Sequence, residues 1–389
     1  MVTSFLCTVL VVLPGCAAPE DLPPLPIGSP LPFLTPEQLA RFQGGEALFN
    51  RVFTAQQGIG PLFNENQCSA CHTFPASGGT GEQKLIRATR FTPPGQCDAL
   101  SAQGGENVRT QVTPALRAQG ITHQPLPAAA TERGEFTVPF LFGLGLIEAI
   151  PEETILSRAD PEDRDGDGIS GRPGRDATGK LGRFGRKLEL AQLSDFIDTA
   201  LRFEMGLTTP AHPIEPSPFA QPFPAASDPA PDPEVNAQTL TLLTDFVRFL
   251  APPSRRARQS AEERQNVQRG EELFHRAGCD LCHVPAMRTG SNDVSALDQR
   301  RVFLYSDLLL HDLGPALANV CGIAATPTEH RTALLMGVSE RQQLLSNGRA
   351  LTLHQAILLH GGEAELAKQR FRNLNEVEQQ RLIDFLRTL

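Results

Sequence analysis

Tryptophan is absent from this chain of 389 residues, and tyrosine occurs once, at Tyr305. Basic clusters are also missing, and the net charge of −9 argues against nucleic acid as a partner. No long stretch alternates apolar and polar residues as a half-buried strand would, so the pattern predicts few strands. The apolar run from Phe5 to Leu13 is shorter than the roughly 20 residues that a helix needs to cross a bilayer. We therefore expect a mainly α protein with many loops rich in glycine and proline.

The most informative feature present is a pentapeptide that occurs twice, as Cys68-Ser-Ala-Cys71-His72 and as Cys279-Asp-Leu-Cys282-His283. C-x-x-C-H is the attachment sequence of a c-type haem. Two cysteines with this spacing can form thioethers to the two vinyl groups of one porphyrin, and the following histidine reaches the iron as its proximal ligand. The sequence thus predicts two covalently bound haems c, with His72 and His283 as iron ligands.

Paired cysteines have two other common uses, in zinc sites and in thiol redox chemistry. A zinc ribbon brings its two C-x-x-C pairs within roughly 15–20 residues of each other, whereas Cys71 and Cys279 are far apart. A thioredoxin-like redox pair requires a βαβ setting, and both pairs here follow segments with a helical pattern. Both cysteine pairs are consistent with haem attachment.

Residues 1–18 are predicted to form an export leader, because the apolar run suits the hydrophobic region of a signal peptide. Leu13-Pro14-Gly15-Cys16 also resembles a lipoprotein signal, in which an acylated Cys16 would tether the protein to a membrane. No Lys or Arg precedes the run and Pro14 is unusual there, so export without a lipid remains the alternative. Haem c is attached outside the bacterial cytoplasm, which predicts a periplasmic or outer-envelope location.

Two cysteines belong neither to the leader nor to the pentapeptides. In an oxidising compartment Cys97 and Cys321 could pair across the chain. Two free buried thiols are the alternative, and the spacing does not choose between them.

An internal repeat indicates two related domains. Residues 43–51 recur as residues 268–276, with a shared Gly-Glu and Leu-Phe. Each copy follows a helix-start signal of the capping-box kind, at Thr35–Gln38 and at Ser260–Glu263. In the second copy the C-x-x-C-H follows almost at once.

Prolines concentrate between residues 209 and 234, which predicts an extended linker rather than packed core. We place a first haem domain at 19–253, with this linker inside it, and a second at 254–389. Helical periodicity predicts helices at three places: Leu188–Phe203, Val235–Leu250 and Leu353–Leu359.

The distal ligands of the two irons decide between electron transfer and reaction with a substrate. His360 ends an apolar helical run and precedes two glycines that let backbone approach a porphyrin closely. It is our candidate for the second haem, with Met336 as the rival and a solvated helix-terminal histidine as the plain alternative. For the first haem only His123, in a loop, is a candidate, and a histidine in such a loop is more often merely exposed to solvent.

Several further segments carry a family resemblance. They are Asp165–Arg172, Gly182–Gly185, Glu204–Gly206, Tyr305–Pro315, Arg331-Thr332, Asn347–Ala350 and His360–Ala364. Together with the two pentapeptides they resemble the bacterial dihaem c-type oxidoreductases of the peroxidase type. That family is related to the dihaem cytochrome c peroxidases and to the methylamine-utilisation dihaem enzyme. The resemblance covers residues 37–389.

The resemblance implies two cytochrome-c-like domains, each with one covalent haem. His360 falls where the peroxidases place the distal methionine of the C-terminal haem. Glu204 falls where they keep an acid–base glutamate above the N-terminal haem, which suits proton transfer between the two oxygens of a peroxide. Hydrogen peroxide is the implied substrate, and a small cytochrome or cupredoxin is the implied electron donor.

The sequence departs from the family at a position near the route between the haems. Relatives have a tryptophan after Phe-Gly, where this chain has Arg186. Phe184 is difficult to oxidise and Tyr305 is the only tyrosine. The chain therefore lacks the tryptophan through which charge would be expected to pass rapidly between the irons.

An acidic turn is a candidate calcium site. Asp163, Asp165 and Asp167 alternate before a glycine, as at the start of a calcium loop, but Gly174 stands where an EF-hand has its glutamate. A solvated acidic turn is the alternative, although dihaem peroxidases do carry a structural calcium. Separately, His311 could reach a haem propionate.

Three functions fit these features. The first is an exported dihaem peroxidase that passes electrons from an external donor through the second haem to the first. The second is a dihaem electron-transfer cytochrome without its own substrate. The third is a dihaem oxidase that acts on a protein or a small organic molecule.

Overall fold

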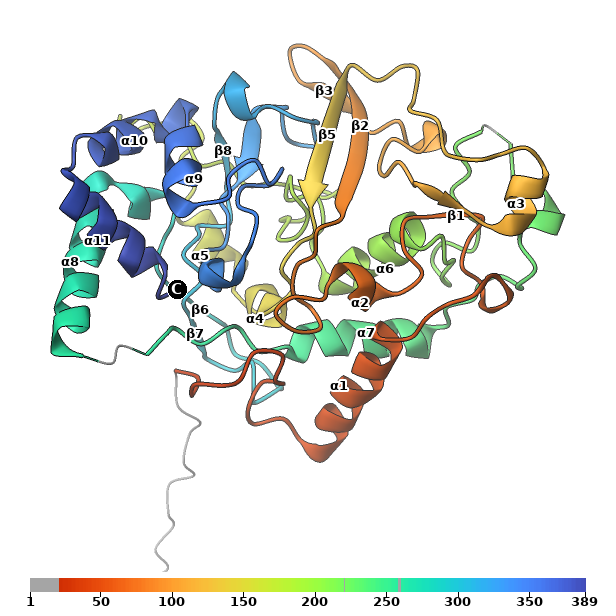
Figure 1. Cartoon of the computed structure of the whole chain (residues 1–389), viewed down its shortest axis with the longest axis horizontal. Coiled ribbons are helices and arrows are strands. Elements are labelled where there is room, and N and C mark those ends of the chain that lie inside the picture. Colours follow the sequence, from red (N-terminus) through yellow and green to blue (C-terminus); the bar gives the residue numbers. More distant parts are fainter. Residues whose placement is uncertain (1–20, 220, 258–259) are drawn as a thin grey trace, which may run out of the picture.

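The computed structural model describes residues 21–219, 221–257 and 260–389. The predicted leader and its acylation candidate, Cys16, lie outside the described residues. In this part of the chain no helix has the length and the apolar character needed to cross a membrane. Helices α8, α10 and α11 lie at one end of the molecule, while α1 and α7 run along its lower edge in the view of Figure 1.

Most helices are short and are separated by long irregular segments. The α-helices are α1 (Pro36–Phe49), α2 (Cys68–Cys71), α3 (Pro114–Ala118), α4 (Leu144–Glu148), α5 (Glu152–Leu156), α6 (Leu193–Glu204), α7 (Ala237–Phe249), α8 (Ala261–Ala277), α9 (Leu353–Leu359), α10 (Glu365–Arg372) and α11 (Glu376–Leu386). The strands are β1 (Leu62–Phe63), β2 (Lys84–Thr92), β3 (Gln96–Asp98), β4 (Gln111–Val112), β5 (Glu132–Thr137), β6 (Met287–Arg288), β7 (Arg301–Val302), β8 (Leu310–Asp312) and β9 (Glu329–Arg331).

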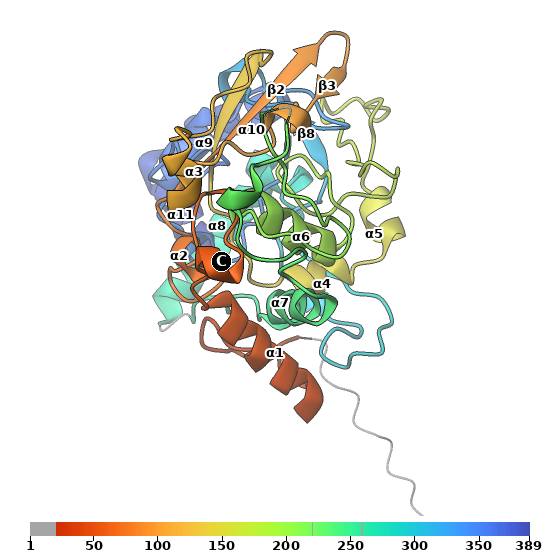
Figure 2. The same ribbon diagram turned by 90° about the vertical axis from the view of Figure 1, so that its right-hand side faces the viewer.

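The first helix pair is formed by α1 and α7, which lie against each other in both views (Figures 1 and 2). Thr35 and Gln38 form the predicted capping box at the start of α1. The two helices cross at Gly45, where a Cβ atom would lie 2.0 Å from the carbonyl oxygen of Leu242. Such a distance is far inside van der Waals contact, so this crossing requires a residue without a side chain.

The second pair, α8 and α11, repeats this geometry. At Gly270, which corresponds to Gly45 in the repeat, a Cβ atom would lie 2.1 Å from the carbonyl oxygen of Arg381. Helix α8 then ends at Gly278, whose φ of 81° is left-handed, and Cys279 follows immediately. The repeat therefore encodes one structural unit, a helix crossing beside each C-x-x-C-H.

A three-stranded antiparallel sheet, in the order β3-β2-β5, occupies the middle of the molecule. Helices make up only about a third of the chain, so the prediction of a mainly α protein with few strands was correct only in part. Strand β2 escaped prediction because Leu85 and Arg87, on one face, both line a cavity. A charged side chain on the inward face hides the alternation that identifies a strand.

The larger apolar core is continuous across residue 253. Helices α1, α4, α6 and α7 contribute to it, and so do residues from the second half such as Leu304, Leu308 and Leu309. A second core is formed by α8 and α11, in which the rings of Phe274 and Phe385 are tilted against each other with centroids 5.4 Å apart. The division into domains at 253 remains a prediction.

The described residues of the proline-rich segment 209–234 are irregular, as expected, apart from an isolated bridge between Thr209 and His212 and one short turn of 3₁₀ helix at Ala225–Ser227. It does not stand away from the fold, however. Phe219 and Phe223 pack against a small apolar cluster that contains Leu62 and Leu116. The segment therefore covers the surface beside α3.

Candidate functional site

Each pentapeptide lines a cavity of its own. The first cavity, of about 370 Å³, is lined by Cys68, Cys71 and His72. The second, of about 530 Å³, is lined by Cys279, Cys282 and His283. Both volumes lie in the range of cofactor pockets, roughly 300–1,000 Å³. The separation excludes a zinc ribbon built from both C-x-x-C pairs.

The four motif cysteines are free thiols. Burial raises the pKa of Cys68, Cys71 and Cys279 to about 12, and it also raises the pKa of Cys282. These groups are therefore protonated at neutral pH. Paired thiols that line a cofactor-sized cavity suit covalent attachment of a porphyrin.

The two motif histidines have matching environments. The Nδ1 atom of His72 lies 3.0 Å from the carbonyl oxygen of Gly79, and Nδ1 of His283 lies 3.0 Å from that of Tyr305. Burial lowers the pKa of each imidazole to about 4, although the backbone hydrogen bonds oppose the shift. Both rings are thus neutral at pH 7 and oriented through one nitrogen, as a ligating histidine requires of its surroundings.

Glu204 lies at the end of α6 and lines the same cavity as His72. Its carboxylate Oε2 accepts a hydrogen bond of 2.8 Å from Nδ2 of Asn64. Burial raises the pKa of Glu204, while hydrogen bonds from Asn64 and Asn107 act in the opposite direction. The structure therefore brings together the first pentapeptide and the predicted acid–base residue, and holds the latter in a fixed network.

Sequence reasoning missed the other polar residues of the first cavity. Asn107 donates from Nδ2 to the carbonyl oxygen of Phe203 at 2.9 Å and so connects the network to α6. Glu106 is another carboxyl group in the lining, and burial raises its pKa. Arg87 forms an ion pair of 2.6 Å with Glu189. None of these residues stands in a recognisable motif, so the sequence carried no signal for them.

The structure places His360 in the second cavity together with His283. His360 caps α9, and its Nδ1 lies 2.7 Å from the carbonyl oxygen of Ala356. Burial lowers the pKa of His360, which keeps it neutral. The rival Met336 packs in the larger core and is not among the residues that line this cavity. The geometry therefore favours His360 over Met336 as the distal ligand, although the ligation itself remains a prediction.

His123 is exposed and does not line the first cavity. The structure thus gives no support to a distal role for it.

His311 lines the second cavity, but both ring nitrogens are engaged. Nε2 lies 2.8 Å from Oδ2 of Asp307, and Nδ1 lies 2.7 Å from Oε2 of Glu363. Burial would lower the pKa of His311, but hydrogen bonds to Asp307, Cys282 and Glu363 outweigh it and raise the pKa to about 12. His311 is therefore a charged group already neutralised by two carboxylates, which does not fit the expected contact with a propionate.

The acidic turn follows α5 and brings its three carboxylates together. Oxygen atoms of Asp163, Asp165 and Asp167 lie within 4.8 Å of one another. Backbone N–H groups of the turn already donate to them, including that of Gly168 to Asp163 at 3.1 Å. Such a turn is stable without an ion, so calcium at this position remains a prediction.

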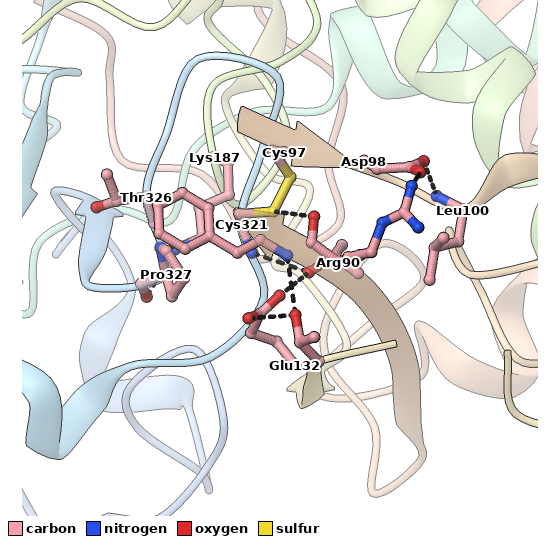
Figure 3. Close-up of a disulfide and its surroundings, with 12 residues drawn as sticks. Arg90, Cys97, Asp98, Leu100, Glu132, Lys187, Cys321, Thr326 and Pro327 are labelled. Atoms are coloured by element: carbon pink, nitrogen blue, oxygen red, sulfur yellow. Dashed lines mark hydrogen bonds and ion pairs between the residues drawn. A yellow bond between two sulfur atoms is a disulfide. The ribbon is translucent and has the colours of Figure 1, made fainter. Parts of the chain in front are cut away.

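Cys97 and Cys321 form a disulfide, which resolves the alternatives that the sequence left open (Figure 3). Cys97 lies in β3 and Cys321 in the loop that precedes β9, with Cα atoms 5.8 Å apart. Both cysteines line the first cavity. Lys187 lies beside the bond and donates to the carbonyl oxygens of Thr326 and Pro327, at 3.2 Å each.

Five residues line both cavities and thus form the wall between them: Val138, Pro139, Phe140, Arg186 and Arg331. Arg186 was predicted to stand near the route between the haems, and the structure places it in this wall. The wall contains no tyrosine, and Tyr305 packs against Phe274 and Phe385 in the second core.

Comparison with known proteins gave one family. A model described as "Di-haem oxidoreductase, putative peroxidase" matches residues 132–389, which include Glu204, the second pentapeptide and His360. No curated protein matches the sequence.

Solved structures with a similar chain path were also found. They include hydrazine synthase of Kuenenia stuttgartiensis (14% identity, 99% of this chain and 100% of that chain, TM-score 0.43), a MauG-like protein associated with microbial copper homeostasis (15%, 96% and 94%, 0.41) and the diheme peroxidase BthA from Burkholderia thailandensis E264 (14%, 92% and 86%, 0.35). At these identities and TM-scores the likenesses carry no argument about activity.

Proposed function

This chain belongs to the di-haem oxidoreductase family, and from that premise we propose that it is an exported peroxidase that reduces hydrogen peroxide at its first cavity. The observation that carries the proposal is the buried carboxyl of Glu204 in the same cavity as Cys68, Cys71 and His72. An electron-transfer cytochrome without a substrate has no use for a proton-transferring group beside its iron.

Haem attachment is assigned to the two pentapeptides. The thiols of Cys68 and Cys71 would hold one haem and those of Cys279 and Cys282 the other, with His72 and His283 as proximal ligands. His360 would be the distal ligand of the second haem. When bound, the two haems supply peroxide binding at one iron and electron transfer at the other.

The chain's own contribution is proton transfer. Reduction of one hydrogen peroxide consumes two electrons and two protons and gives two molecules of water. The Glu204 carboxylate could accept a proton from one oxygen of the peroxide and return it to the other, which would leave as water when the O–O bond breaks. Asn64 donates a hydrogen bond to one carboxylate oxygen of Glu204 and so holds the side chain in place. The raised pKa of Glu204 brings the group closer to neutral pH, where exchange of a proton in both directions is efficient.

Export is supported by the disulfide between Cys97 and Cys321, because such bonds persist in oxidising compartments. The proposed location is the periplasm or outer envelope, with a lipid on Cys16 as a further proposal. A small cytochrome or cupredoxin is the proposed electron donor. Calcium at the turn of Asp163, Asp165 and Asp167 is proposed as a structural ion.

The deciding experiment is a stopped-flow reaction of the reduced, matured protein with hydrogen peroxide, with the spectrum of each haem followed separately. We expect oxidation of both haems in proportion to the peroxide added. If both haems are low-spin and do not react with peroxide, the protein is an electron-transfer cytochrome rather than a peroxidase. Reaction with peroxide but turnover only in the presence of a protein or organic substrate would favour the oxidase. Mass spectrometry must first find two covalently retained haems.

A further inference from the structure

Three arginines gather at the wall between the two cavities. Arg186 and Arg331 line both cavities, and Arg341 lines the second. They come from separate segments: the turn after Phe184, strand β9, and the residue that follows the 3₁₀ turn Val338–Glu340. We call these residues the arginine trio.

No member of the trio forms an ion pair with a carboxylate of the described residues. Arg186 donates to the carbonyl oxygen of Thr137 and, at 3.2 Å, to its hydroxyl. Arg341 donates to the carbonyl oxygen of Met336 at 3.1 Å and stacks over Phe140, 4.9 Å from the ring centroid. The guanidinium of Arg331 has no hydrogen-bond partner within the described parts of the chain.

Most other cations of the cavities differ from the trio in this respect. The exception is Arg370 of α10, which lines the second cavity without an ion pair among the described residues but is exposed. Arg87 in the first cavity is paired with Glu189 at 2.6 Å. In the second cavity His311 is held between two carboxylates, and Lys368 is paired with Glu365 at 2.5 Å. Apart from the exposed Arg370, the unpaired positive charge of the cavities is thus concentrated at the wall between them.

Three adjacent guanidinium groups without a counter-ion are costly to hold inside a protein. Burial lowers the pKa of Arg186 to about 9, with further lowering from the charges of Arg331 and Arg341. Burial also lowers the pKa of Arg331 and of Arg341 to about 10. All three remain charged at pH 7, so the fold holds a concentrated positive charge that only an anionic ligand can neutralise.

We propose that the arginine trio binds haem propionates, with at least one propionate from each of the two haems. The inference rests on the proposed function in that it needs both cavities to hold a haem. A carboxylate matches the guanidinium fork in two parallel hydrogen bonds, and each haem carries two carboxylates. Since Arg186 and Arg331 face both cavities, one cationic centre serves both cofactors.

If the arginine trio contacts both haems, a change in its charge should alter the midpoint potentials of both. Reduction lowers the charge of a haem by one unit, so a nearby cation stabilises the reduced form more than the oxidised form. Loss of the charge at Arg331 should therefore shift both midpoint potentials to more negative values. It should also raise the pKa of the bound propionates, because a neighbouring cation favours their ionised form.

The test is a spectroelectrochemical titration of the full-length protein with both haems bound, repeated over a range of pH. Arg331→Met should shift both potentials negatively and move their pH dependence to higher pH. Arg331→Lys keeps the charge and should shift them less. The matched control is Arg183→Met, because Arg183 is a buried arginine that donates to the carbonyl oxygen of Ile150 at 2.9 Å and lines neither cavity. It should leave both potentials unchanged.

Unchanged potentials in Arg331→Met, or a shift confined to one haem, would overturn the inference. If that variant does not accumulate, a crystal structure of the natural protein decides, since propionates directed away from the trio would also overturn it. Failure of the proposed function is distinguishable. A natural protein that retains two haems but does not turn over peroxide would remove the peroxidase proposal while the shared shift could still be observed.

Discussion

At the scale of single residues, the activity of the first cavity is expected to depend on Glu204. Glu204→Gln removes the group that moves a proton between the peroxide oxygens but keeps the size of the side chain. We expect peroxide reduction to slow by a factor of about 10²–10⁴, the usual contribution of a general acid–base. Steady-state turnover and the mass of the matured protein together check this, because both haems should remain attached.

Glu153→Gln is a suitable control, since Glu153 is an exposed glutamate of α5 that lines neither cavity. It should keep normal turnover. Normal turnover in Glu204→Gln as well would remove Glu204 from the mechanism.

Asn64 is expected to tune Glu204 rather than to react itself. Its hydrogen bond favours the ionised carboxylate and so lowers the pKa of Glu204. Asn64→Leu should therefore raise that pKa, and the acid limb of the pH profile of kcat/KM should move to higher pH. In the double variant with Glu204→Gln, loss of Asn64 should add little, because residues that act through one another are not additive. Fully additive losses would contradict this role.

Several site residues could be predicted from the sequence and others could not, for a physical reason. Cys68, Cys71 and His72 form a contiguous motif whose spacing is fixed by the porphyrin, so the sequence alone identifies them. Arg186 and Arg331 stood out only through the family resemblance and Arg341 not at all, because the three arginines come from separate segments that only the fold brings to one wall. The partners of Glu204 are of the same kind, since Asn64 approaches it from a segment 140 residues away.

At the scale of elements, the helix crossings depend on their glycines. Gly45→Ala would place a methyl group about where the carbonyl of Leu242 lies. We expect a loss of roughly 1–3 kcal/mol in the free energy of unfolding, the usual range for overpacking. Chemical denaturation measures it.

Gly44 provides the matched control on the same helix. A Cβ atom there would lie 3.5 Å from the nearest atom of Leu242, an ordinary contact. Gly44→Ala should therefore stabilise the protein by about 0.5–1 kcal/mol, because alanine favours the helix over glycine. Equal effects of the two substitutions would show that the crossing does not constrain residue 45.

The disulfide joins two elements that are far apart in the chain. Cys97→Ser with Cys321→Ser should lower the free energy of unfolding by roughly 2–5 kcal/mol, because the closed loop that restricts the unfolded chain is lost. A mild reductant should lower the stability of the natural protein by a similar amount and leave the double variant unchanged. Sensitivity of the double variant to the reductant would assign the effect to other groups.

Helices and strands could be predicted where residues that line a cavity do not interrupt the periodicity of apolar side chains. The expected helix Leu353–Leu359 matches α9, and Val235–Leu250 differs from α7 by only a few residues at its ends. The start of α6 was placed too early, because residues 188–192 form a turn and an isolated bridge that also bury apolar side chains. In β2 the inward-facing residue Arg87 is polar because it lines a cavity. The sequence of this strand therefore lacks the alternation of apolar and polar residues that identifies a half-buried strand.

At the scale of the whole molecule, the stability of the fold should fall in acid partly through His330. Burial lowers the pKa of this histidine to about 3, and its Nε2 has no hydrogen-bond partner among the described residues. The unfolded chain takes up this proton near pH 6.5 and the folded chain does so only near pH 3. Between these values stability should therefore decrease with falling pH, by at most about 1.4 kcal/mol per pH unit from this one group.

His330→Gln should reduce the slope of unfolding free energy against pH in that window. His354→Gln is the control, because His354 is an exposed histidine. The measurement is urea denaturation at a series of pH values. Parallel slopes for the natural protein and His330→Gln would assign the acid sensitivity to other groups.

The apolar core that extends across residue 253 constrains how this chain can change in evolution. Because Leu304, Leu308 and Leu309 complete a core built on α1, α4, α6 and α7, neither half can be exchanged for that of a distant homologue without new partners for these leucines. Gene fusion or recombination near residue 253 would leave apolar surfaces without packing partners on both halves. Insertions are better tolerated in exposed turns such as residues 93–95 between β2 and β3, so diversification of this lineage is expected in such turns rather than by exchange of halves.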